Sequence, residues 1–225
     1  MTKIQYIVCG VCLIGTIALI PQPASAGVVF TTLGPNGEFV GSGYYVSGSA
    51  YDNQVVAGVF TLGAGTTVGD AVLALGNPSW SLNNHPVNVY IESDSSGLPG
   101  SIIATLSQVG TILPFGNSAG GGLTTFTCSG AACTLGAGSY WLVAQEPDGH
   151  TQQFWDYAYQ NATGNLASNN AGSPTGPWVG STARIVVGFR IDDTASGVPE
   201  PASILLFATG LLGIGIVRRR SIGRG

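Results

Sequence analysis

Short runs of β-branched and aromatic residues recur along the middle of the chain, separated by turn-forming residues. Residues 87–92 alternate apolar and polar side chains with a period of two, the pattern of a half-buried strand. Residues 140–145 alternate less cleanly, which suits a strand that is buried on both faces. The runs predicted to be strands are 28–33, 39–46, 54–62, 71–75, 87–92, 102–109, 123–127, 140–145, 153–159 and 184–191.

The connections between these runs carry glycine or aspartate where turns need unusual backbone angles, as at 95–100, 120–122, 136–138 and 147–149. About ten short strands joined by such turns predict an all-β fold, an antiparallel β-sandwich of jelly-roll-like type. We expect this domain to span residues 27–197, which is long enough to bury a core of its own.

The N-terminus has the three parts of a secretory signal peptide. Lys3 precedes an apolar run over residues 4–20, and Ala24-Ser25-Ala26 places small residues before a cut at Gly27. We therefore predict a signal helix within residues 1–26, with cleavage marked by Ala24, Ala26 and Gly27. An uncleaved membrane anchor is the alternative.

The C-terminus predicts a membrane segment. Residues 202–217 form an apolar run of 16 residues, followed by a basic end at 218–225. As a helix the run spans about 24 Å, which crosses a hydrocarbon core of about 30 Å if the bilayer thins and the arginines snorkel. The positive-inside rule keeps these arginines cytoplasmic, so the preceding domain lies outside.

The tail over 198–225 resembles the PEP-CTERM sorting signal of Gram-negative bacteria. The residues that carry the resemblance are Val198, Pro199, Glu200, Pro201, Arg218, Arg219 and Arg220. The resemblance implies export through the inner membrane, transient anchoring there by the C-terminal helix, and processing by exosortase. It also implies a final place at the cell surface or in the extracellular matrix, in association with exopolysaccharide. An ordinary membrane anchor with a proline-rich stalk is the alternative.

The composition excludes several classes of fold and of function. Only 8% of the 225 residues are charged, and 35 glycines and 12 prolines exclude a long helical bundle. Residues 27–197 hold two basic and ten acidic side chains, a net charge of −8. A lysine-free acidic domain is not expected to bind nucleic acid or anionic lipid.

The middle domain is similar to the choice-of-anchor R family over residues 55–191. The similarity rests on the run 87–92, the turn 97–100, the run 103–106 and the segment 135–143. It implies a surface β-domain that is found with different sorting tails and whose molecular role is undefined.

Cys128 and Cys133 bracket four residues and are predicted to form a disulfide, because an exported domain folds in an oxidising compartment. A metal site at these cysteines is the alternative, but it needs further ligands, and His85 and His150 are the only histidines.

Three pairs of carboxylates are candidates for acid–base chemistry: Glu92/Asp94, Glu146/Asp148 and Asp192/Asp193. Such pairs suit a glycosidase, a weak Ca²⁺ site or plain solubility. No serine lies in a G-x-S-x-G elbow that would partner His150. We predict no catalytic residues, no metal site and no cofactor beyond weak Ca²⁺ binding, with a carboxylate-dependent polysaccharide hydrolase as the alternative.

An aromatic run over residues 154–159 is the best candidate for ligand binding. Alternation places Trp155, Tyr157 and Tyr159 on one face, and Trp178 could join them in a surface that stacks on sugar rings. Packing in the core is the alternative for these side chains. The sequence as a whole predicts an exported, non-catalytic surface protein associated with exopolysaccharide or biofilm, or else a passive structural coat protein.

Overall fold

The computed structural model describes residues 26–78, 86–115 and 121–194, and these residues form an all-β domain. The folded unit spans residues 25–196. The predicted signal helix and the predicted transmembrane helix lie outside the described residues. Among the residues that are described, no helix is long and apolar enough to cross a membrane. The elements are β1 (Val28–Thr31), β2 (Val40–Ser47), β3 (Val55–Leu62), β4 (Thr66–Gly76), β5 (Asn88–Ser95), β6 (Leu98–Val109), β7 (Gly122–Thr127), η1 (Ala131–Cys133), β8 (Thr134–Leu135), β9 (Gly138–Gln145), β10 (Gln152–Tyr157), η2 (Tyr159–Asn161), β11 (Thr163–Asn169), β12 (Val179–Ile185) and β13 (Phe189–Asp193).

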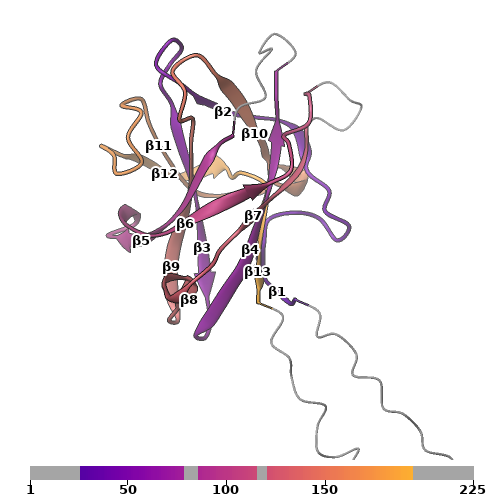
Figure 1. Cartoon of the computed structure of the whole chain (residues 1–225), viewed down its shortest axis with the longest axis vertical. Helices are drawn as coiled ribbons and strands as arrows, with labels where there is room; N and C mark the ends of the chain where they lie inside the picture. The colour runs from indigo at the N-terminus through magenta and orange to yellow at the C-terminus, as the bar shows by residue number, and fades with distance from the viewer. Residues whose placement is uncertain (1–25, 79–85, 116–120, 195–225) are drawn as a thin grey trace, which may run out of the picture. The chain divides into compact units, whose positions relative to one another are not determined.

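The strands form one curled antiparallel sheet, a half-barrel (Figure 1). Its main path runs β1-β13-β4-β7-β6-β5-β9-β3-β11-β12, while β10 joins β2 to β4 and β8 pairs with β4. Strand β6 belongs to both halves, because Leu98 to Leu106 pair with β5 and Ser107 to Val109 pair with β7. The prediction of an antiparallel all-β fold is therefore confirmed. A jelly-roll-like sandwich was expected, and it would have two separate sheets. Here β6 pairs with β5 and with β7, and it joins the two halves into one continuous sheet.

The inner face of the curled sheet buries the main core. Phe60 on β3 lies 6.1 Å from Phe30 on β1 and 6.4 Å from Phe189 on β13, measured between ring centroids. These rings join the two halves of the sheet across its concave side. Each buried aromatic side chain removes a large apolar area from water, which favours the folded state by a few kcal/mol.

A second apolar cluster lies on the outer face of β3, β9 and β11. Its fully buried members are Val55, Ala57, Trp141, Val143 and Ala167, and the partly buried Leu98 and Trp178 pack against it. The alternate residues of β9, such as Leu142, face the main core. The expectation that residues 140–145 are buried on both faces is thus confirmed.

The β5–β6 hairpin is held against this outer face. Its two-residue turn places Ser96 at φ 56° and Gly97 at φ 83°, the left-handed pair that two-residue hairpin loops favour. The Asp94 carboxylate accepts the Gly97 N–H at 3.1 Å and the Trp141 indole N–H at 2.8 Å. One side chain therefore fixes the turn to the sheet below it.

Strands β8 and β11 lie outside the predicted runs, β12 overlaps one run only at its last two residues, and that run is divided. Strands β11 and β12 begin within stretches that the pattern leaves as loops. The run 184–191 was predicted as one strand, but β12 ends at Ile185 and β13 begins at Phe189.

The two ends of the folded unit lie side by side. Val28 on β1 pairs with Asp192 on β13. Gly27 N–H donates to the Asp193 carboxylate at 2.5 Å, and Asp193 N–H donates to the Gly27 carbonyl at 2.9 Å. The chain therefore enters and leaves this domain at the same end of adjacent strands.

Candidate functional site

The structure separates the four aromatic residues that were predicted to share one sugar-binding surface. Trp155 is completely buried, and its indole N–H donates to the Gly188 carbonyl at 3.0 Å. This corrects its assignment to a surface, since the face of β10 that carries Trp155 is turned into the core. Tyr157 is half-buried and packs edge-on against Tyr44 at 5.1 Å.

Trp178 and Tyr159 lie apart from each other. Trp178 is half-buried and packs against the outer apolar cluster of β3, β9 and β11. Tyr159 begins η2 and is 37% exposed. Of the four, Tyr159 is the one with an exposed ring beside a cleft.

We call this depression the Tyr159 cleft. Its volume is about 530 Å³, and it is formed by β1, the β1–β2 loop, η2 and β13. Its lining residues are Val28, Thr31, Leu33, Gly34, Pro35, Asn36, Gly37, Tyr159 and Arg190.

The β1–β2 loop is shaped by Glu38. Its carboxylate accepts the Asn36 backbone N–H at 2.8 Å and the Asn36 side-chain amide at 3.0 Å. These two hydrogen bonds favour the charged form and hold the pKa of Glu38 below its usual range. These hydrogen bonds within the loop fix its conformation without a ligand.

Gly34 allows this loop to approach the Tyr159 ring closely. A Cβ at position 34 would stand 3.0 Å from two ring carbons of Tyr159, which is closer than side chains normally pack. The backbone adds a second link, because Tyr159 N–H donates to the Thr32 carbonyl at 3.0 Å. The ring is thus held next to the loop.

Strained backbone follows directly after Tyr159. Gln160 and Asn161 have φ of 55° and 54°, the left-handed region that non-glycine residues seldom occupy. Two such residues in succession persist only where the surrounding structure holds them. Asn161 N–H donates to the Ala158 carbonyl at 3.1 Å, which closes this tight turn.

Arg190 gives the Tyr159 cleft its cation. It is one of only two basic residues in the segment 27–197. Its guanidinium donates from Nε and Nη2 to one oxygen of Asp192, both at 2.9 Å, which fixes the side chain while leaving other N–H groups to donate. An exposed ring, an amide and a planar donor group therefore surround one cleft.

The carboxylate pairs do not form a common open site in the described residues. Glu92 is completely buried and neither of its oxygens has a hydrogen-bond partner, whereas Asp94 is exposed. Glu146 is buried and accepts the Thr151 hydroxyl. Burial raises the pKa of both Glu92 and Glu146 to about 8.

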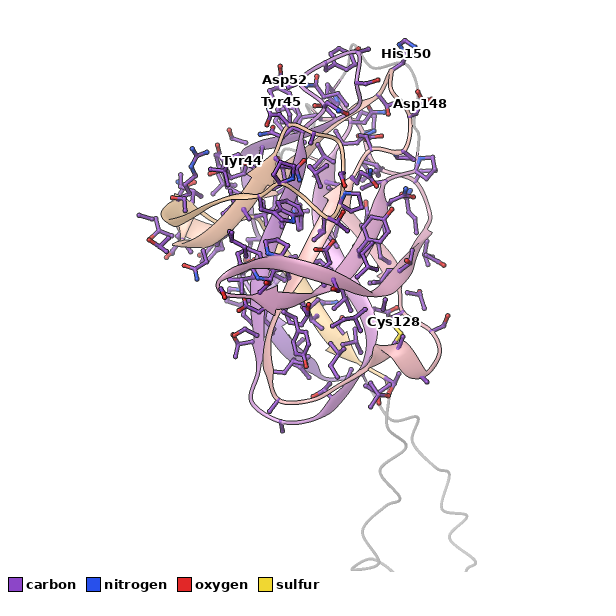
Figure 2. The ribbon with its side chains drawn as sticks, turned by 90° about the vertical axis from the view of Figure 1, so that its left-hand side faces the viewer. Tyr44, Tyr45, Asp52, Cys128, Asp148 and His150 are labelled. Atoms are coloured by element: carbon purple, nitrogen blue, oxygen red, sulfur yellow. A yellow bond between two sulfur atoms is a disulfide. The ribbon has the colours of Figure 1, made fainter. Side chains whose placement is uncertain are left out.

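The other members of the last two pairs each have a structural partner. Asp192 holds Arg190, and Asp193 accepts the Gly27 N–H. Asp148 accepts the backbone N–H of the exposed His150 at 2.9 Å, and both lie at the end of the domain opposite Cys128 (Figure 2). His85 lies outside the described residues.

The predicted disulfide between Cys128 and Cys133 is present, with their Cα atoms 5.9 Å apart. It closes the segment around η1 between β7 and β8. Within the described ranges, no group of three or more His, Cys, Asp or Glu side chains could hold a metal ion. The two thiols are joined to each other in this disulfide.

The comparisons with known proteins concern the tail. Residues 197–220 match the PEP-CTERM protein-sorting motif. The PEP-CTERM motif implies an exported protein that exosortase sorts to the cell surface. It contains the predicted residues Val198 to Pro201 and Arg218 to Arg220, which lie outside the described residues, as does Ala24 of the predicted cleavage site. No curated protein matches this chain.

Sequence reasoning missed Arg190 and Asn36 as companions of Tyr159. Arg190 carried a usable signal, because a cation that is nearly alone in an acidic domain stands out. Asn36 carried none, since an asparagine in a glycine- and proline-containing turn is ordinary. Their proximity to Tyr159 depends on the pairing of β1 with β13.

Proposed function

We propose that this chain is an exported, non-catalytic surface protein that binds extracellular polysaccharide at the Tyr159 cleft. The observation that carries the proposal is an exposed tyrosine ring, closely approached by Gly34, next to the donor groups of Arg190 and Asn36. Tyrosine offers a flat apolar face together with a polar tip, which suits the mixed surface of a sugar ring. Export by the PEP-CTERM system supplies the setting in which such a ligand is present.

The charges around the cleft favour sugars without a carboxylate. Asp192 already neutralises Arg190, and Glu38 adds a negative charge on the loop. The net charge of −8 on residues 27–197 would repel an acidic polymer at low salt. We therefore expect neutral regions of a polysaccharide to be bound. A middle domain of choice-of-anchor R type, which remains a prediction, would suit this role.

The direct test is binding to the host's own exopolysaccharide, immobilised on a sensor surface. We expect Tyr159→Ala to weaken binding about tenfold, which corresponds to about 1.4 kcal/mol for the lost ring contact. Tyr51→Ala is the matched control, because Tyr51 is a tyrosine of similar exposure (45%) that does not line the cleft. The control should bind as the unaltered chain does.

Three outcomes would contradict the proposal. The unaltered chain could fail to bind, which would favour a passive coat protein. Tyr159→Ala could bind as well as the control, which would move the site elsewhere. Incubation with the polysaccharide could release new reducing ends, which would favour the hydrolase alternative.

A further inference from the structure

A second cleft lies on the outer face of the sheet, between the turn of the β5–β6 hairpin and strands β11 and β12. We call it the hairpin cleft; its volume is about 460 Å³. The side chains that give it its chemistry are Ser96, Leu98, Trp141, Asn165, Ser181 and Thr182. In Figure 1 the labels β5, β11 and β12 lie on the same side of the domain.

The two walls of the hairpin cleft are held by specific contacts. Asp94 fixes the turn to the Trp141 indole, as described above. On the opposite wall, a Cβ at Gly180 would stand 2.6 Å from Cδ2 of Leu98. A larger residue at position 180 would require the Leu98 side chain to shift away from its present contact with β12. The cleft is therefore a built feature of the hairpin rather than a loose gap.

The lining of the hairpin cleft holds no charged side chain. Three hydroxyls and one amide can each donate and accept hydrogen bonds, while Leu98 supplies an apolar wall and the buried Trp141 forms the floor. A ligand matched to this surface carries many hydroxyl groups, some apolar C–H surface and no net charge. Neutral sugar residues have these properties.

We infer that the hairpin cleft is a second binding site for uncharged sugar residues, so that one domain can bridge two polysaccharide chains. The inference rests on the proposed function at the Tyr159 cleft and adds a second, independent site to it. The two clefts share no residue, and they are built from different elements, β1, η2 and β13 in one and β6, β9, β11 and β12 in the other. A ligand in one therefore leaves the residues of the other free.

Site-specific binding can be followed at the Trp141 indole. Trp141 lines the hairpin cleft and its N–H donates to Asp94 of the adjoining turn, whereas no tryptophan lines the Tyr159 cleft. We expect its ¹H–¹⁵N signal in the full-length chain, assigned through Trp141→Phe, to shift when neutral hexasaccharides are added. The probes are cellohexaose, laminarihexaose and mannohexaose. Absence of a shift with all three, at concentrations that saturate the Tyr159 cleft, would overturn the inference.

A pair of double variants tests the lining. Asn165→Ala with Thr182→Ala removes two exposed polar groups of the hairpin cleft and should abolish the Trp141 shift. Thr163→Ala with Asn170→Ala is the matched control, because it changes the same residue types at exposed positions that do not line the cleft. The control should keep the shift. Equal behaviour of the two double variants would contradict a site at this cleft.

Bridging is measured as the low-shear viscosity of a dilute solution of the host's exopolysaccharide. The unaltered chain should raise the viscosity, and the Asn165→Ala/Thr182→Ala variant should still bind immobilised polysaccharide but no longer raise it. If the unaltered chain binds no polysaccharide, both the proposed function and this inference fail. If it binds, and the variant raises the viscosity as the unaltered chain does, the inference alone fails.

Discussion

Three carboxylic acids are buried in this domain with few polar partners. Neither oxygen of Glu92 is hydrogen-bonded, and Glu146 and Asp156 each have one oxygen without a partner. Burial raises the pKa of Glu92 and Glu146 to about 8 and that of Asp156 to about 7. A hydrogen bond from the Gly121 N–H to Asp156 only partly offsets this effect.

These acids make the folded domain more stable in mild acid than at alkaline pH. An unfolded chain releases their protons near pH 4, whereas the folded chain keeps them until pH 7 to 8. The contribution of these three acids to the free energy of unfolding is therefore largest below pH 4 to 5. It decreases as the pH rises to 8. Each acid contributes a slope of up to about 1.4 kcal/mol per pH unit between its two pKa values. Urea unfolding at pH 5, 6, 7 and 8 should show a falling midpoint.

Glu92→Gln checks the origin of this dependence, because an amide of the same shape stays neutral at every pH. The variant should show a flatter fall of the urea midpoint between pH 5 and 8. Asp52→Asn changes an exposed carboxylate and serves as the control that keeps the full dependence. A midpoint that rises with pH in the unaltered chain would show that the three acids are not neutral in the fold.

Single side chains were the hardest level to predict from the sequence. Alternation grouped Trp155 with Tyr157 and Tyr159, but it gives no information about which face of a strand is turned inward. Strand β10 also ends at Tyr157, so the period of two does not extend to Tyr159 in η2. The alternation therefore could not show that only Tyr159 has an exposed ring beside a cleft.

At the scale of elements, most of the strands followed from local pattern, because β-branched and aromatic runs bounded by glycine leave few other choices. Strands β11 and β12 did not, since Thr163–Asn169 and Val179–Ile185 are rich in small and polar residues. Strand β11 forms because it pairs with β3 on one side and β12 on the other. Such pairing is a long-range interaction that overrides weak local preference.

The β5–β6 hairpin allows a test of turn chemistry. Gly97 has φ 83° and nothing lies within 4 Å of the position its Cβ would take, so Gly97→Ala should cost only backbone strain, about 1–2 kcal/mol. Gly63→Ala is the matched control, because position 63 is equally open and has no left-handed φ. Thermal unfolding should show a lower midpoint for Gly97→Ala than for Gly63→Ala. Equal midpoints for the two variants would mean that an alanine at position 97 causes no backbone strain in the turn.

At the scale of the whole molecule, the acidic domain and the basic tail have separate tasks. Replacing Arg218, Arg219 and Arg220 with alanine removes the charges that are predicted to stay cytoplasmic and to orient the tail, so we expect the chain to be lost from the membrane fraction of the exporting host. Arg184→Ala, which removes an exposed arginine outside the PEP-CTERM motif, should leave the membrane fraction unchanged. Cell fractionation followed by immunoblotting measures both. Membrane retention of the triple variant would contradict this role for the basic end.

The pairing of β1 with β13 also has a mechanical consequence. The tail leaves the domain from β13, and the same strand carries Arg190 of the Tyr159 cleft. If the tail anchors the chain as the sequence predicts, a polysaccharide held there would pull on it through β13, which is hydrogen-bonded to β1 on one side and β4 on the other. Force applied along a strand between two neighbours loads many hydrogen bonds at once in shear. Such a load would travel along β13 from Arg190 toward Asp193, past Ile191, which is buried in the main core, so the core and the two flanking strands would resist it together.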